Sequence, residues 1–265
     1  MLWIAALAVG VVYAGIVVFM YVYQGKLMYP GSGSTEPPQA LGLAGVSEVR
    51  FEAGNGQKLL AWWQPPQDGR PVVLYFHGNA GTLAGRADKF THFGAGGYGL
   101  LMPAYRSYSG NGGTPSQPQL MRDAEAAARW LATHAPDAPV ILYGESLGGS
   151  VAMQLAPGLK PAAIVLEGAF DGAADMAQAR YPILPAAWLI RDRWDSIRIA
   201  PDISAPVLML HGGHDKTIPL SHGKRLFSAL PEPKRFIVVE EGNHVDLFDF
   251  GGAQHVMNWL ASHRL

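Results

Sequence analysis

The chain has 265 residues, a length that suits one large α/β domain with a sizeable buried core. Twenty basic and 21 acidic side chains give a net charge of −1 without any basic run, which excludes nucleic acid and other polyanions as expected partners. The sequence contains no cysteine, so disulfides, thiolate metal sites and a cysteine nucleophile are excluded.

The chain begins with an uncharged apolar segment over residues 2–23. As a helix this segment would be about 33 Å long, enough to cross the hydrocarbon core of a bilayer. A cleaved signal peptide is the alternative, but no Lys or Arg precedes the apolar run and no small-x-small cleavage site follows it. We therefore predict a membrane protein with a single-pass anchor over residues 1–24.

The predicted anchor has two further features. Lys26 is the only charged side chain near either end, so the positive-inside rule leaves open which side of the membrane holds the rest of the chain. Ala6, Gly10 and Ala14 recur every four residues, and a face of such small residues would let two anchors pack closely as a homodimer.

A segment rich in Gly, Pro and Ser follows over residues 31–45 and shows no periodicity. This composition predicts a juxtamembrane linker over residues 25–45, followed by one folded domain over residues 46–265. A flexible linker makes the anchor a passive tether, so the domain is expected to keep its chemistry without the anchor.

The predicted domain opens with two β segments, residues 47–53 and 59–63, joined by the hairpin signal Gly54-Asn55-Gly56. Short apolar runs then alternate with Ala-rich helical stretches; the runs are residues 72–76, 99–102, 140–143, 163–166, 207–210 and 236–239. Near-continuous apolar strands that alternate with helices indicate a parallel sheet covered by helices on both faces. The predicted fold class is therefore α/β. An amphipathic helix over residues 250–263 is predicted to close the domain.

The motif Gly144-x-Ser146-x-Gly148 lies between one of these apolar runs and an Ala-rich helical stretch. On such a strand-to-helix turn a serine hydroxyl is held out into a cleft, and flanking glycines let the turn pack closely. The backbone N–H of Leu147, at the start of the predicted helix, is suited to stabilise an oxyanion. We predict Ser146 as a nucleophile and Glu145 as a residue that packs or bonds a loop.

Two later loops supply the partners that a serine nucleophile needs. Asp215 follows the apolar run 207–210, and His244 follows the last run, so both fall at the same edge of the sheet as Ser146. The order Ser146, Asp215, His244 predicts a catalytic triad. His211 and His214 beside Asp215 suggest a metal cluster, but one acid cannot both orient His244 and bind a metal well, so we predict no metal.

The loop His77-Gly78-Asn79-Ala80-Gly81 ends the first predicted parallel strand. Its small residues allow backbone amides to turn toward a ligand, so the N–H of Asn79 is the predicted second oxyanion donor, with Ala80 as the alternative. His77 is expected to be a structural partner within this loop.

These motifs carry a family resemblance. With HGNAG at residues 77–81 and GESLGG at residues 144–149, the chain from about Val46 to its end resembles the membrane-anchored α/β-hydrolase-domain group of the α/β-hydrolases. The resemblance implies the α/β-hydrolase fold and a serine esterase, thioesterase or lipase, although similar proteins are sometimes labelled peptidases. Ser107 departs from the pattern, because the group commonly has glycine after the arginine of this loop.

Residues 171–203 are rich in aromatic and aliphatic side chains and are predicted to form a lid, which either lines an acyl pocket over Ser146 or simply packs onto the core. We expect a membrane-anchored serine hydrolase that cleaves carboxylic esters or thioesters with an acyl chain, without any cofactor. A serine peptidase of the same fold and a non-catalytic interaction module are the alternatives.

Overall fold

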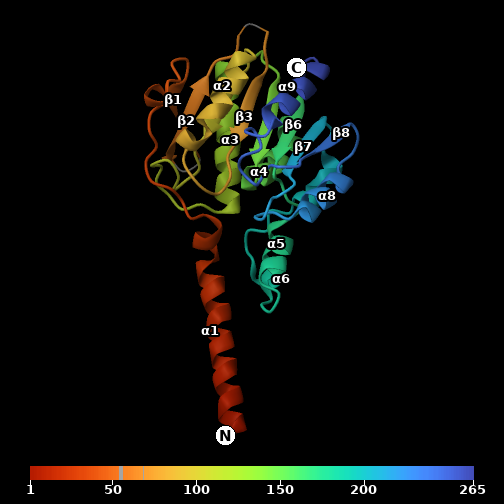
Figure 1. Cartoon of the computed structure of the whole chain (residues 1–265). Coiled ribbons are helices and arrows are strands. Elements are labelled where there is room, and N and C mark those ends of the chain that lie inside the picture. The colour runs from red at the N-terminus through yellow and green to blue at the C-terminus, as the bar shows by residue number, and fades with distance from the viewer. Residues whose placement is uncertain (54–55, 68) are drawn as a thin grey trace.

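The computed structural model describes residues 1–53, 56–67 and 69–265 (Figure 1). Its strands are β1 Ser47–Glu52, β2 Lys58–Gln64, β3 Val72–Phe76, β4 Gly99–Pro103, β5 Val140–Glu145, β6 Ala163–Glu167, β7 Val207–Gly212 and β8 Lys234–Val239. They form one sheet in the order β1-β2-β4-β3-β5-β6-β7-β8. β1 and β2 pair antiparallel and β2 pairs antiparallel with β4, whereas the six strands from β4 to β8 are parallel.

The predicted parallel sheet is confirmed, and the reason is visible in the burial of its strands. Every residue of β3, β4, β6 and β7 is buried, as expected for strands that are covered on both faces. The two antiparallel strands that open the domain are present as well. Gly54 and Asn55 of the predicted hairpin signal lie outside the described residues.

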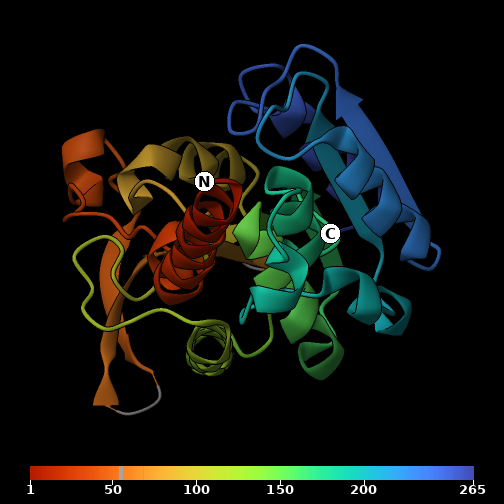
Figure 2. The ribbon, with the colours of Figure 1, turned by 90° about the horizontal axis from the view of Figure 1, so that it is seen from below.

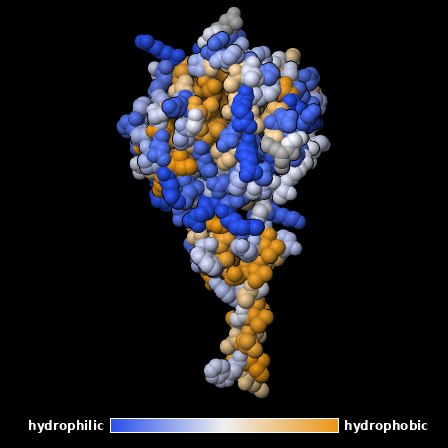
Figure 3. Space-filling view, turned by 180° about the vertical axis from the view of Figure 1, so that it is seen from behind, coloured by the Kyte–Doolittle hydropathy of each residue, from blue (hydrophilic) through white to orange (hydrophobic). Residues whose placement is uncertain are grey.

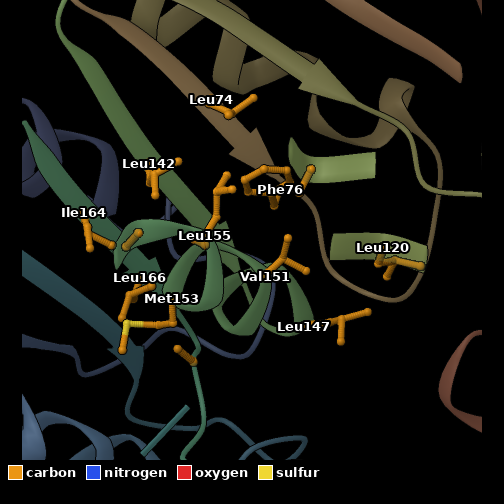
Figure 4. Close-up of a cluster of buried hydrophobic side chains, with 14 of the residues drawn as sticks. Leu74, Phe76, Leu120, Leu142, Leu147, Val151, Met153, Leu155, Ile164 and Leu166 are labelled. Carbon is orange, nitrogen blue, oxygen red and sulfur yellow. The ribbon is translucent and has the colours of Figure 1, made fainter. Parts of the chain in front are cut away.

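Helices cover both faces of the sheet, and the side chains of the strands divide between them. α2 (Ala87–Ala95) and α9 (Gly252–Ser262) pack on one face, while α3 (Gln117–His134), α4 (Leu147–Leu159) and α8 (Leu220–Ala229) pack on the other. Figure 4 shows part of the second core, where Met153 of α4 lies next to Leu166 of β6. The predicted closing helix is α9, and it buries Val256, Trp259 and Leu260 as expected.

The N-terminal helix α1 (Leu2–Met28) stands away from the body of the protein (Figure 1). Within the described residues, α1 is the one helix that is both long and apolar enough to cross a membrane. It continues past the predicted end of the anchor at residue 24, so the first part of the expected linker is helical.

The rest of the expected linker packs on the domain and does not form a free connection. Tyr29 is buried, the N–H of Ser32 donates to the carbonyl of Ser107 at 2.9 Å, and the hydroxyl of Thr35 accepts the N–H of Ala84 at 3.1 Å. Ser107 itself has a φ of 62°, a left-handed conformation that glycine adopts most readily. This explains why glycine is common at that position in the resembling group.

A helical insertion follows β6 and lies below the carboxyl ends of the strands. It comprises α5 (Ala173–Arg180), α6 (Ala186–Leu189), α7 (Ser196–Ile199) and a 3₁₀ turn (Ala200–Asp202), which occupy the range predicted as a lid. Figures 1 and 2 show α5 and α6 beside α1. We call this insertion the lid.

The start of α4 lies in unusually close contact with the end of β3. A Cβ atom on Gly148 would lie 1.9 Å from the carbonyl oxygen of Phe76, so no side chain fits at this position. The absence of a side chain therefore fixes where α4, and the turn that precedes it, meet the sheet.

We expect Gly148→Ala to lower the stability of the protein. The added methyl group would push α4 away from β3, and overpacking of this kind typically costs about 1–3 kcal/mol. The matched control is Gly158→Ala in the same helix, where a Cβ would meet nothing within 4 Å. Thermal unfolding of both variants in detergent measures the effect; equal midpoints would contradict the packing argument.

Candidate active site

Ser146 occupies the turn between β5 and α4 with a φ of 53° and a ψ of −115°. Such a backbone conformation is sparsely populated in proteins and persists only where the surrounding structure holds it. Here the N–H of Ser146 donates to the carbonyl of Glu167 at 2.8 Å, and a Cβ on Gly144 would lie 2.4 Å from the carbonyl oxygen of Gly148. Close packing on both sides therefore holds the serine in this strained turn.

His244 lies in the loop after β8 and bridges Ser146 and Asp215. Its Nε2 is 2.9 Å from the Ser146 Oγ, and its Nδ1 is 2.7 Å from the Asp215 Oδ2. Because an ionised carboxylate only accepts hydrogen bonds, Nδ1–H donates to Asp215 and the Nε2 is left to accept the serine hydroxyl. The structure thus brings the three predicted residues together in one hydrogen-bonded chain.

Asp215 lies in the turn after β7, and its carboxylate is fully buried. Its Oδ1 accepts the N–H groups of Thr217 and Ile218, both at 2.8 Å. Burial by itself would raise the pKa of Asp215, but the hydrogen bonds from His244 and from the backbone outweigh it and lower the pKa below its ordinary value. Asp215 is therefore ionised at neutral pH.

Gly168 is a residue of the site that sequence reasoning missed. It follows β6, has a φ of 57°, and a Cβ there would lie 3.1 Å from the Cε1 of His244. The bare backbone thus forms a wall against which the imidazole packs. No local pattern marks this glycine, because the ring that it contacts comes from a loop far along the chain.

The two predicted oxyanion residues, Asn79 and Leu147, line the same cavity as Ser146. Leu147 is the first residue of α4, so its N–H has no acceptor within the helix. The side-chain amide of Asn79 donates to the carbonyl of Met28 at 3.0 Å, and the carbonyl of Asn79 accepts the hydroxyl of Tyr108 at 2.9 Å. The last turn of α1 therefore holds one of the candidate oxyanion residues.

A buried ion pair joins this loop to the strand that carries Ser146. The guanidinium of Arg86 donates to both carboxylate oxygens of Glu145, at 2.5 and 3.0 Å, and also to the carbonyl of Ala80 at 2.8 Å. Burial alone would raise the pKa of Glu145, but the Arg86 guanidinium holds it well below its ordinary value. Glu145 bonds a loop as expected, whereas its partner Arg86 was not identified from the sequence.

His77 is a structural residue of the same loop, as predicted. Its ring is buried, its Nδ1 donates to the carbonyl of Gly78 at 2.6 Å, and its Nε2 accepts the N–H of Tyr105 at 3.3 Å. Burial and the nearby Arg86 charge lower the pKa of His77 to about 3. The imidazole is therefore neutral over the physiological range.

Two further titratable residues near the site, His211 and Asp246, have hydrogen-bonding partners close to them in the sequence. The buried His211 donates from Nε2 to the carbonyl of Ile218 at 2.9 Å, and His214 is exposed. Asp246, an acid two residues after His244, accepts the N–H of Asn243 at 2.6 Å within its own loop. Across the described ranges, no group of three His, Asp or Glu side chains is arranged to hold a metal ion.

A cavity of about 300 Å³ opens beside Ser146, and its lining is mostly apolar. The lid contributes more of the cavity wall than α1 does; its lining residues are Met176, Ala177, Tyr181, Leu184, Ala186, Leu189, Ile190 and Trp194. Helix α1 contributes Met20, Gln24, Leu27 and Met28. The lid therefore lines a pocket, and the expectation that α1 is a passive tether is wrong, because part of the pocket wall belongs to it.

No protein-family model matches the sequence. The uncharacterized protein Rv2307c of Mycobacterium tuberculosis is 36% identical over 90% of this chain and 86% of its own length. The α/β-hydrolase domain-containing protein WAV2 of Arabidopsis thaliana is 30% identical over 92% of this chain and 88% of its own. The chain belongs to the α/β-hydrolase superfamily. The lysophosphatidylserine lipase ABHD12 of Danio rerio is 31% identical over 65% of this α/β-hydrolase and 51% of its own length.

Solved structures agree with this assignment at the level of the fold. The Pyrococcus furiosus esterase Pf2001 superposes with a TM-score of 0.73 over 88% of this α/β-hydrolase and 96% of the esterase, at 17% sequence identity. The predicted α/β-hydrolase fold is therefore confirmed, and the family places the chain among the hydrolases.

The lowered pKa of His77 predicts a loss of stability in acid. Its pKa falls from 6.5 to about 3 on folding, so between these values the unfolded chain binds more protons at this residue, and the free energy of unfolding falls as the pH is lowered. The contribution amounts to about 1.4 kcal/mol for each pH unit.

His77→Gln keeps one donor and one acceptor at this position but does not titrate. We expect its thermal midpoint in detergent to fall less between pH 6.5 and pH 5 than that of the wild type. A parallel fall in the two proteins would contradict the assignment of a buried, neutral His77.

Proposed function

We propose that this α/β-hydrolase is a membrane-anchored serine hydrolase that cleaves carboxylic esters or thioesters with an acyl chain. The observation that supports this most directly is the hydrogen-bonded chain from Ser146 through His244 to Asp215, which ends in an apolar cavity. A nucleophile, a base within hydrogen-bonding reach and a carboxylate that orients the base are the parts that acyl transfer needs.

In the proposed first step the Ser146 Oγ attacks the acyl carbonyl carbon while His244 accepts the hydroxyl proton. Asp215 keeps the proton on Nδ1 and stabilises the imidazolium that forms. The N–H groups of Leu147 and Asn79 are the proposed donors to the oxyanion. His244 then gives its proton to the leaving alcohol or thiol as the bond to the acyl carbon breaks, which leaves an acyl-enzyme.

Water completes the cycle. His244 takes a proton from water as the water oxygen attacks the acyl carbon, and it returns that proton to Ser146 as the acid is released. These steps need no cofactor, because the proton and the leaving group are handled by the three side chains alone.

The walls of the cavity support an acyl substrate. A peptide substrate needs fixed polar partners for its amides, whereas the lid and α1 present mostly aliphatic and aromatic side chains. The lipase ABHD12 among the relatives also supports a lipid-like ester. We therefore favour esterase, thioesterase or lipase chemistry over the peptidase alternative.

The membrane anchor is part of the proposal. α1 is 27 residues long and has the length and apolar character that a bilayer-spanning helix needs. Its small residues Ala6, Gly10 and Ala14 are exposed, which supports the further proposal that two anchors pair.

A fluorophosphonate probe tests the nucleophile. The probe should label the wild-type protein and fail to label Ser146→Ala, because the activated serine is the group that it modifies. Ser228→Ala, at an exposed serine on α8, is the matched control and should label normally. Labelling that persists in Ser146→Ala, or its absence in the wild type, would contradict the proposal and favour a non-catalytic interaction module.

Asp215→Asn should leave the fold intact and lower the turnover steeply. An amide would favour the wrong imidazole tautomer, which costs up to about four orders of magnitude in serine proteases. Asp246→Asn should keep most of the activity, since Asp246 bonds only its own loop. Turnover of a short soluble ester and thermal midpoints distinguish the two; a similar loss in both variants would move the acid away from Asp215.

A further inference from the structure

The tip of the lid carries apolar side chains that the rest of the protein leaves uncovered. Residues 181–190 contain no charged side chain and lie between Arg180 and Arg191. Within them Ile183 and Trp188 are each 83% exposed. Figure 3 shows apolar surface running from α1 up to a band of hydrophilic side chains at the base of the globular body. The lid tip lies on the apolar side, next to the anchor helix (Figures 1 and 2).

The depth at which the lid tip would lie in a bilayer crossed by α1 follows from its contact with that helix. The hydroxyl of Tyr13 donates to the carbonyl of Ile183 at 2.9 Å. Tyr13 lies about 22 Å before the end of α1 at Met28, at a rise of about 1.5 Å per residue. Tyr13 is also near the middle of the uncharged run 2–23. If α1 crosses a bilayer, Ile183 therefore lies within the hydrocarbon and not above it.

Gln24 fixes the base of the lid to the same face of α1. Its side-chain amide donates to the carbonyl of Leu189 at 3.2 Å and accepts the N–H of Arg191 at 2.7 Å. The Arg191 guanidinium lies 5.4 Å from the centre of the Tyr21 ring. These contacts keep the lid and the anchor side by side along more than one turn of α1.

The carbonyl groups in the first half of the tip are bonded within the protein, as carbonyl groups in hydrocarbon need to be. The carbonyl oxygens of residues 181–185 all accept hydrogen bonds from within the protein; the donors are Leu184 N, Gln178 Nε2, Tyr13 Oη, Trp188 N and Leu189 N. Pro182 and Pro185 have no N–H to satisfy. Water would satisfy these carbonyls in an exposed loop, whereas in lipid each unpaired group is costly.

The cavity over Ser146 runs between these two elements. Met20 and Gln24 of α1 line it on one side, and Leu184 and Ile190 of the lid line it on the other. Met20 lies about 12 Å from the end of α1 along the helix axis. The apolar walls therefore extend from the candidate nucleophile toward the part of α1 that is suited to a bilayer.

We propose that residues 181–190 enter the bilayer beside α1, and that the acyl chain of a membrane lipid reaches Ser146 from the hydrocarbon between the two. The route rests on the proposed function as a whole, whereas the insertion of the lid tip rests only on its membrane anchor and not on the proposed chemistry. The exposed side chains, the depth set by Tyr13 and the internally bonded carbonyls all fit bilayer hydrocarbon as the occupant of this surface. A protein partner would explain the apolar side chains but not their depth along a membrane-spanning helix.

The absence of native cysteine allows a direct test of insertion in the full-length protein. Ile183→Cys carries an environment-sensitive fluorophore after reconstitution into phosphatidylcholine vesicles that contain lipids with nitroxide groups deep in their acyl chains. Phe250→Cys, at an exposed apolar residue before α9, is the matched control. We expect strong quenching at residue 183 and little at residue 250; equal, weak quenching at both would overturn the insertion.

Activity tests the route independently. Ile183→Asp and Trp188→Asp place a charge on the tip at positions that do not line the cavity. Both variants should hydrolyse a short soluble ester in detergent like the wild type, but should lose activity on an ester lipid in vesicles by about tenfold or more, because a buried carboxylate opposes entry into the bilayer. Phe250→Asp should affect neither activity.

Unchanged vesicle activity in both aspartate variants would overturn the route. If the wild-type protein hydrolyses neither substrate, the proposed function and the route both fail, and the quenching experiment still decides whether the lid tip enters the bilayer.

Discussion

The site depends on one close packing contact, the approach of the first turn of α4 to the end of β3. Without a side chain on Gly148, the helix backbone comes so near the carbonyl of Phe76 that an added Cβ would lie 1.9 Å away. This contact sets the position of the turn that carries Ser146, whose φ is 53°. The packing of α4 against the sheet keeps this strained turn in place. The sheet itself has a hydrophobic core on each of its two faces.

A second set of interactions ties the candidate oxyanion loop both to the sheet and to α1. The buried pair of Arg86 and Glu145 holds the loop against β5, since Arg86 bonds the loop carbonyl of Ala80 as well. The side chain of Asn79 binds the carbonyl of Met28 at the end of α1. Helix α1 therefore ends on the loop beside Ser146, and the position of α1 and the geometry of the candidate site are physically linked.

The same helix shapes the cavity together with the lid. Because Gln24 and Tyr13 bond the lid backbone, α1 and the lid form one structural unit below the sheet. The N-terminal helix therefore combines two properties: it is long and apolar enough to cross a membrane, and it supplies part of the wall next to Ser146.

The sequence by itself determined the parallel sheet, the serine turn and the order of the three candidate catalytic residues. These features are recorded in local patterns: apolar runs, glycine spacing and the positions where strands end. Because parallel strands end at the same edge of the sheet, the residues that follow them lie at that edge. Only the tertiary structure decided that Arg86 pairs with Glu145, that Gly168 faces His244, and that α1 contacts the lid. These contacts join residues far apart in the chain, 170 positions in the case of Tyr13 and Ile183, so no local pattern records them. The same reason explains why a Gly- and Pro-rich segment that predicts a flexible linker instead packs on the domain: its hydrogen-bonding partners lie in distant loops.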